Sequence, residues 1–432
     1  MGLRLFLFLV GLFSLYRVHL IGMIGISEIL ICIMGPILYF KDFNQLRRDG
    51  FNTMANLMIL CCVGCVISSW YNDTFFYNAI RGFAAPFVFF CSFIFTYHFL
   101  RKDFGALKWL VTGIALSNVL GLLGGGYGIE METIFGTENE YWLTVLVAPI
   151  FSIPIFLFYE RMPWFFSCAI VVAGGFYKIL STASGRSAAL ISFAAALLIW
   201  IGRKSAQKMG SIKRNFLTYL ILSILSIYVA KTVYSQAAMS GALGEASQSK
   251  FYAQTGGKTS LVSILLGGRS EALVCILAAL DRPFVGYGPW AIDTKGYADE
   301  VRSKYGVYDY EAEVRQQKAL ASLGMSKVRL IPTHSHIFGN WVWYGIFGLL
   351  MWAYVVHLII KFYRNAPDAI PQWWGCLSLV LPSTLWHIFF SPFSSRVSIA
   401  VYICAILFAL KFQKDSFNPD PRFWEEREKF LP

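Results

Sequence analysis

The chain has 432 residues, of which 56% are hydrophobic, 17% aromatic and 14% charged, and its mean hydropathy is +0.56. Charged residues make up about a quarter of a soluble globular domain, so this composition excludes one and predicts a protein that crosses a membrane many times. Basic connections beside anionic lipid account for much of the net charge of +12, which therefore does not imply a nucleic acid partner.

Apolar runs that suit membrane-spanning helices recur along the chain, each close to the roughly 20 residues that a span needs. We place them at 3–17, 20–40, 53–70, 79–99, 107–124, 142–159, 163–181, 187–202, 215–234, 337–360, 372–390 and 396–412. This pattern predicts one integral membrane domain over residues 1–432, an all-α polytopic fold of about 12 transmembrane helices.

Basic residues in the short connections set the orientation of these helices. Lys and Arg gather after the second, fourth and eighth runs and in the tail from Lys411 to Lys429. The connection after the fifth run carries only acidic charges, Glu130, Glu132, Glu138 and Glu140. Positive charge stays on the cytoplasmic side. We therefore expect both termini in the cytoplasm and the loop over 235–336 on the outer side.

The outer loop over 235–336 is the longest hydrophilic stretch, and we expect it to contain short helices. The sequence predicts an apolar helix from Arg269 to Leu280, stopped by Asp281-Arg282-Pro283. A turn follows from Pro283 to Gly288, in which Gly286 and Gly288 allow close backbone approach. Charged and aromatic residues at helical spacing from Tyr297 to Leu320 indicate an amphipathic cover.

Two arginines in small-residue surroundings are candidates for anion binding. Arg186 lies in Ser-Gly-Arg-Ser where the seventh run turns into the eighth, and Arg269 lies in Gly-Gly-Arg-Ser at the start of a predicted helix. An arginine at membrane depth either faces a polar partner or extends to the interface as an anchor. Both sit on the outer side and suit a phosphate or diphosphate. Arg81, near the outer end of the fourth run, either meets an anionic lipid or anchors its helix.

Two histidines, His334 and His336, immediately precede the tenth run. Such a pair can ligate a metal, but no Cys, Asp or Glu lies nearby in sequence to complete a zinc site, and we predict no metal. His334 suits a general base or hydrogen-bond partner at neutral pH. His336 either shares this proton transfer or caps the following helix.

Three motifs follow one another in the chain: Ser184-Gly185-Arg186-Ser187, then Gly268-Arg269 with the turn over 283–288, then His334-Ser335 followed by Gly345-Ile-Phe-Gly348. In this order they resemble the O-antigen ligase and O-antigen polymerase superfamily, which includes exopolysaccharide repeat-unit polymerases. The usual third motif of that family is His-Asn or His-Ser before Gly-x-x-Gly. On this spacing His334, not His336, takes the family's catalytic position.

The resemblance implies a GT-C-like, metal-independent and inverting glycosyltransferase without a cofactor, in a bacterial inner membrane and active on its periplasmic side. Arg186 and Arg269 would hold the undecaprenyl diphosphate of a lipid-linked glycan donor. His334 would orient or deprotonate the acceptor hydroxyl. The outer loop would act as a lid that brings Arg269 and His334 over Arg186. Polysaccharide-assembly proteins are further partners that this function implies.

The acceptor distinguishes two versions of this function. A polymerase, which we favour, would extend a second lipid-linked repeat unit, whereas an O-antigen ligase would transfer the glycan to the lipid A core. A lipid-glycan flippase or transporter is the alternative from another class, with arginines lining a path. The first six and the last six runs show no matching Gly/Pro breaks, which argues against the inverted repeats of many transporters.

Overall fold

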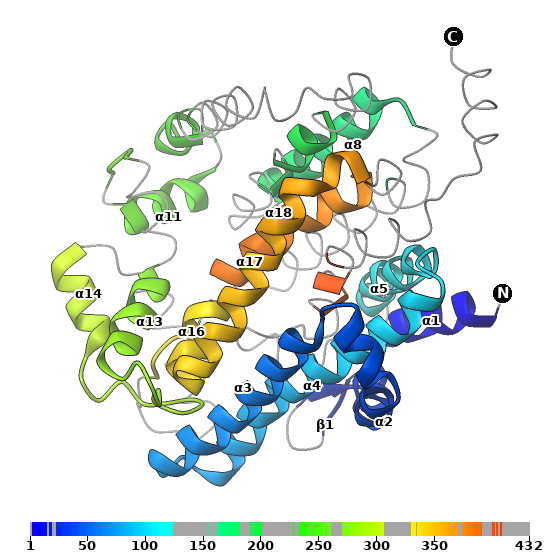
Figure 1. Cartoon of the computed structure of the whole chain (residues 1–432). Coiled ribbons are helices and arrows are strands. Elements are labelled where there is room, and N and C mark those ends of the chain that lie inside the picture. The colour runs from blue at the N-terminus through cyan, green and yellow to red at the C-terminus, as the bar shows by residue number, and fades with distance from the viewer. Residues whose placement is uncertain are drawn as a thin grey trace.

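The structure is a computed structural model of the whole chain (Figure 1). It describes residues 2–14, 17–19, 23–123, 162–181, 194–200, 234–242, 244–255, 257–260, 270–305, 330–333, 335–369 and 374–390, with the shorter pieces 155, 191–192, 228, 232, 400–401, 403–404 and 407.

The protein is mostly helical, as the composition predicts. Its elements in the first half are α1 (Gly2–Leu12), β1 (Arg17–His19), β2 (Met23–Gly25), α2 (Ile26–Arg48), α3 (Asn52–Tyr71), α4 (Phe76–Lys102), α5 (Ala106–Leu123) and α8 (Trp164–Ser181). Those in the second half are α11 (Glu245–Thr255), α13 (Ser270–Asp281), α14 (Tyr297–Tyr305), α16 (His336–Tyr344), α17 (Ile346–Ala369) and α18 (Trp374–Phe390).

The N-terminal region differs from the prediction of two adjoining spans. The run at 3–17 gives a helix of only 11 residues, and an antiparallel hairpin of β1 and β2 delays the next helix until Ile26. This stretch is rich in β-branched residues and glycine, which favour strands and turns over helix. The Glu28 carboxylate accepts the Gly25 backbone N–H at 3.0 Å, which fixes where α2 begins.

Other predicted runs agree closely with helices. Runs 53–70, 79–99, 107–124, 163–181 and 372–390 correspond to α3, α4, α5, α8 and α18. The run at 337–360 is divided at Gly345 into α16 and α17. The runs at 142–159, 215–234 and 396–412 lie largely outside the described residues, and the run at 187–202 is described only at 191–192 and 194–200, so the number of twelve spans stays a prediction.

Within the described part of the chain, α3 and α4 are long and apolar enough to cross a membrane. Shorter apolar helical stretches accompany them at Gly2–Leu12, Ala106–Ser117, Trp164–Gly174, Ile346–Lys361 and Leu377–Phe390. These helices indicate association with a membrane.

Small residues bring α1 and α5 into direct backbone contact. A Cβ on Gly11 would lie 2.4 Å from the Leu110 carbonyl oxygen, and one on Gly113 would lie 2.2 Å from that of Phe8. Glycine at both positions lets the two helices approach closely, as small residues do between membrane helices, where the hydrophobic effect adds little.

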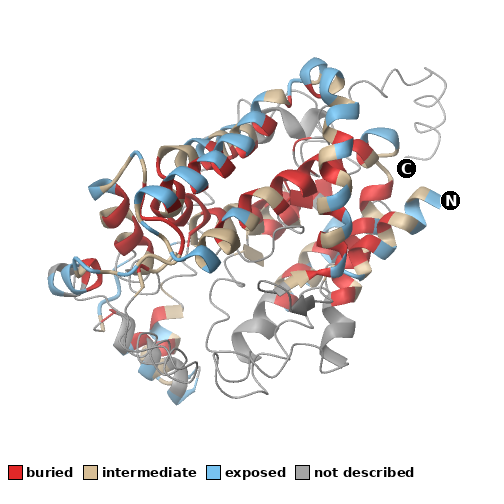
Figure 2. Cartoon of the chain, turned by 90° about the horizontal axis from the view of Figure 1, so that it is seen from below, coloured by how far each residue is buried: buried red, intermediate tan, exposed pale blue. Residues whose placement is uncertain are grey.

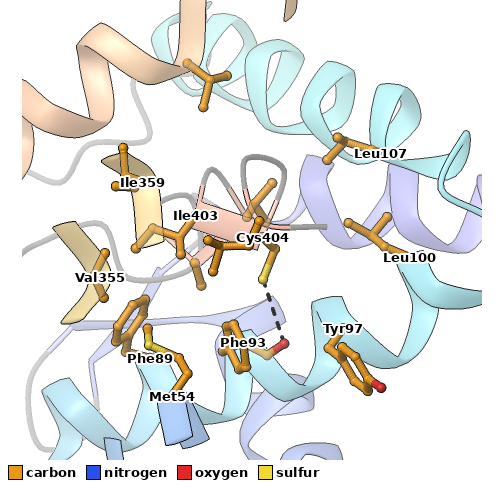
Figure 3. Close-up of a cluster of buried hydrophobic side chains, with 14 of the residues drawn as sticks. Met54, Phe89, Phe93, Tyr97, Leu100, Leu107, Val355, Ile359, Ile403 and Cys404 are labelled. Atoms are coloured by element: carbon orange, nitrogen blue, oxygen red, sulfur yellow. Dashed lines mark hydrogen bonds between the residues drawn. The ribbon is translucent and has the colours of Figure 1, made fainter. Parts of the chain in front are cut away.

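The main core is built around α4. Phe89 and Phe93 are fully buried, and the Phe89 ring stacks on Trp352 of α17 with centroids 5.4 Å apart. Figure 3 shows these α4 side chains facing Val355 and Ile359 of α17 and Cys404 near the C-terminus. Buried residues line the inner faces where helices meet, while exposed ones lie on the outer faces (Figure 2). Helix α4 is thus the central element.

A second, smaller core holds together elements of the loop predicted over 235–336. It combines α13, α14, the turn after α13, the segment before α16 and the last turn of α16. Its buried members are Val274, Cys275, Ala278, Ala279, Tyr287, Tyr297, Ala298, Val301, Ile331 and Val342. The predicted apolar helix and the first part of the amphipathic cover therefore exist and pack together, whereas residues 306–320 lie outside the described ranges.

Candidate functional site

The turn over 283–288 is fastened to the junction of α16 and α17. Two motifs that lie about sixty residues apart in the sequence therefore form one structural unit. Three hydrogen bonds make the connection: Trp341 Nε1 to the Pro283 carbonyl (2.9 Å), Ile346 N to the Phe284 carbonyl (3.0 Å) and Tyr287 N to the Val342 carbonyl (2.6 Å). Turn and junction adjoin through backbone atoms, as the glycine-rich sequence predicts.

Glycines make this approach sterically feasible. Gly345 has φ 62° and ψ −146°, a conformation found almost only in glycine, and a Cβ there would lie 2.0 Å from the Phe284 carbonyl oxygen. Gly286 has φ 77°, and its Cβ would lie 2.6 Å from the Val342 carbonyl oxygen. The turn therefore packs against the break between α16 and α17.

Asn72 connects the same turn to the α3–α4 connection. Its amide donates to the Gly286 carbonyl at 3.2 Å and to the Ser68 carbonyl at 2.8 Å, and its Oδ1 accepts from Arg282 at 2.5 Å. The Arg282 guanidinium also lies over the Tyr287 ring, 4.6 Å from its centroid. The turn is thus joined to both α3 and α16.

Helix α13 is joined to the segment that leads into α16. The Cys275 thiol donates to the Pro332 carbonyl at 2.6 Å. In the sequence, Arg269 directly precedes α13 and His334 follows Pro332 by two residues. Arg186, Arg269 and His334 themselves lie outside the described residues, so their roles stay predictions.

His336 is the first residue of α16, and its ring is fully buried. The ring packs edge-on against Trp352, with centroids 5.1 Å apart, and lies 6.4 Å from the His387 ring. We expected His336 either to share proton transfer or to cap the helix. The cap is instead Ser335, whose hydroxyl accepts the Phe338 N–H at 3.2 Å, because a short hydroxyl side chain reaches the first-turn donors.

A charged and phenolic cluster adjoins the turn. The Asp281 carboxylate accepts from the Tyr287 hydroxyl and from Lys295 Nζ at 2.7 Å, and Tyr287 and Tyr297 share a hydroxyl hydrogen bond. These bonds, the one from Lys295 first, lower the pKa of Asp281 below its usual value. Burial, followed by the bond with Tyr287, raises the pKa of Tyr297. The cluster is therefore ionised at Asp281 and neutral at both phenols near pH 7.

Arg81, on the first turns of α4, contacts two aromatic rings. Its guanidinium carbon is 4.6 Å from the Trp290 ring centroid and 5.3 Å from that of Tyr77. Trp290 in turn packs against Trp343 of α16, with centroids 4.5 Å apart. The structure thus places Arg81 against the segment that follows the 283–288 turn.

Sequence reasoning missed three residues of this assembly: Asn72, Arg282 and Trp290. Their partners are distant in the chain, so no local pattern reveals them. The sequence marks Arg282 only as part of a helix stop. Its position beside a glycine-containing turn is a signal that could have indicated a contact with that turn. Among the described residues, no three His, Cys, Asp or Glu side chains gather to hold a metal.

No protein-family model, curated protein or solved structure matches this chain.

Proposed function

We propose that the chain is a glycosyltransferase of the bacterial inner membrane that joins undecaprenyl-diphosphate-linked glycan repeat units in surface polysaccharide synthesis. The main support is the assembly of the second and third motifs. The turn over 283–288 and the glycines at Gly345 and Gly348 belong to one hydrogen-bonded unit, and Cys275 bonds the backbone two residues before His334. Motifs separated by about sixty residues thus lie together, as a shared site requires.

In the proposed reaction, the acceptor hydroxyl oxygen attacks the anomeric carbon of the donor glycan. The bond from that carbon to the diphosphate oxygen breaks, and undecaprenyl diphosphate leaves. His334 takes the hydroxyl proton, and Arg186 and Arg269 neutralise the charge that grows on the diphosphate. The donor carries its own activation, so the proposal needs neither nucleotide nor metal.

Substitutions in purified protein test the assignment. With a synthetic lipid-diphosphate glycan as donor, we expect His334→Ala, Arg269→Ala and Arg186→Ala to abolish product formation. Gel filtration and membrane insertion should be unchanged. Full activity in His334→Ala would remove the proposed base.

His336 supplies the matched control two residues along. Its ring is buried against Trp352, so truncation to alanine would leave a cavity and confuse catalysis with folding. We therefore choose His336→Gln and expect partial activity. Loss of transfer only in that variant, with normal thermal unfolding, would move the proton-transfer role from His334 to His336.

The acceptor separates the polymerase from the ligase. A gel of surface glycan from a deletion strain should retain a single core-linked repeat and lose long chains if the protein is a polymerase. Loss of all core-linked glycan, with lipid-linked polymer accumulating, would instead identify an O-antigen ligase.

The flippase alternative has its own readout. Protein that forms no glycosidic product yet moves the lipid-linked donor across the bilayer of a liposome would contradict the enzyme proposal. Both measurements use the same purified full chain and the same donor.

A further inference from the structure

The guanidinium of Arg81 is shaped and placed to bind an anion that the chain itself does not provide. The rings of Tyr77 and Trp290 lie against it, with centroids 5.3 Å and 4.6 Å from the guanidinium carbon. Across the described ranges, neither a hydrogen bond nor an ion pair joins Arg81 to the protein, and Asp73 in the preceding turn does not pair with it. Contact with aromatic rings uses none of the N–H donors on the planar edge of the guanidinium, so these donors stay available to an external acceptor.

The covering ring of Trp290 is held there at a conformational cost. Trp290 has φ 56°, which is a true outlier for a bulky side chain. Trp343 supports the indole, and Gly82 admits the preceding residue, because a Cβ on Gly82 would lie 2.1 Å from Pro289 Cγ. Such strain persists only where surrounding contacts enforce it, and it is common at ligand sites.

Arg81 sits at the depth of lipid phosphates if α4 crosses the membrane. Arg81 and Lys102 are separated by 21 positions of one helix, or about 32 Å, close to the hydrocarbon thickness of about 30 Å. The adjoining ends of α3 and α4 expose large aromatic side chains, with Trp70 81% and Phe76 75% exposed. Trp, together with Tyr, is enriched at membrane interfaces, so these residues mark the outer boundary of the bilayer.

We propose that Arg81, covered by Tyr77 and Trp290, binds the phosphate of a lipid headgroup in the outer leaflet. Phosphate is an anion that accepts two parallel N–H bonds from one guanidinium, and an interfacial site with low water content strengthens them. The lipid can be a bulk phospholipid or the diphosphate lipid of the proposed donor, since both present the same chemistry. The site uses none of the residues assigned to glycosyl transfer.

Lipid binding to the full chain tests this site without any transfer reaction. Delipidated protein in detergent is titrated with phosphatidylglycerol, with undecaprenyl diphosphate and with diacylglycerol, which lacks phosphate, and bound lipid is counted by native mass spectrometry. We expect Arg81→Gln to weaken binding of at least one phosphate lipid by about tenfold or more, and to leave diacylglycerol unchanged.

Two further variants separate shape from charge. Arg81→Lys keeps the positive charge but lacks the planar edge, so it should weaken binding less than Arg81→Gln. Arg47→Gln, at the opposite end of the helix framework, removes an exposed cation and controls for general attraction of anionic lipid. If Arg81→Gln does not fold, Trp290→Leu keeps the cation and removes its cover, and should also weaken binding.

The pattern of losses identifies the lipid. Weakening confined to undecaprenyl diphosphate assigns the site to the donor, and weakening confined to phosphatidylglycerol assigns it to bulk lipid. The proposal would be overturned if Arg81→Gln bound both phosphate lipids as well as the Arg47→Gln control does. Where Trp290→Leu replaces Arg81→Gln, the same comparison applies to it. Because the readout is binding, a failure of the proposed glycosyl transfer would leave this result unaffected.

Discussion

Replacing Gly345 by alanine should detach the 283–288 turn from the α16–α17 junction. Alanine at φ 62° and ψ −146° costs about 1 to 3 kcal/mol in backbone strain. Its Cβ would also lie 2.0 Å from the Phe284 carbonyl oxygen, which is backbone and cannot rotate away. Separating the segments loses the bonds from Ile346 N and Tyr287 N, each worth about 1 kcal/mol. These bonds hold the turn in place in the wild type, and the strain of alanine weakens the docked state against them by about 1 to 3 kcal/mol, with the collision in addition.

Hydrogen exchange followed by mass spectrometry measures this loss directly. The amides of Tyr287 and Ile346 are the donors of the two bonds, and both lie in short peptides that can be resolved. A control is Gly244→Ala, since Gly244 has φ 88° but no heavy atom within 4 Å of the added Cβ. The control carries a strain of about 1 to 2 kcal/mol without a collision.

The two variants should differ by about 2 kcal/mol, so both amides should exchange about thirtyfold faster in Gly345→Ala than in Gly244→Ala. Loss of docking should also lower glycosyl transfer if the proposed function is right. Equal exchange at Tyr287 and Ile346 in the two variants would show that this junction does not hold the turn.

Three further changes probe the surrounding contacts. Arg282→Leu removes a charged donor from Asn72, so the turn should loosen by about 1.5 to 3 kcal/mol, measured by exchange of the turn amides. The pKa of Tyr297 is raised by burial and by Tyr287, so its stabilising effect is complete below about pH 10 and is lost as pH rises through the raised pKa. The melting temperature of Tyr297→Phe should therefore fall less above about pH 10 than the melting temperature of the wild type. Ser335→Ala removes the cap of α16 and should destabilise the protein by about 1 kcal/mol in a denaturant titration.

The helices that the sequence predicts well are those in which one apolar run makes one element. Helices α3 and α4 follow from their composition, because a continuous apolar stretch must satisfy its backbone within itself. The hairpin of β1 and β2 escaped prediction because Val18 and Ile24 are as apolar as the helix formers around them. Hydropathy therefore locates apolar segments but does not say which backbone they adopt.

The division at Gly345 depends on tertiary structure in the same way. Glycine is common inside membrane helices, so its presence in an apolar run does not predict a break. The break is set by the Phe284 carbonyl, which comes from a segment sixty residues earlier. Asn72 and Arg282, which are 210 positions apart, are likewise paired only by the fold. The glycine motifs can be recognised in the sequence, whereas the residues that they contact are seen only in the structure.

These contacts also change how the outer loop can move. We expected a lid over Arg186, but residues 282–290 are bonded to the α3–α4 connection through Asn72 and to the α16–α17 junction. Swinging that segment as a rigid lid would break several hydrogen bonds at about 1 kcal/mol each and would uncover Trp290 from Arg81. If the proposed function holds, the turn is then a fixed wall of the site, and a lipid-linked substrate would enter past other segments.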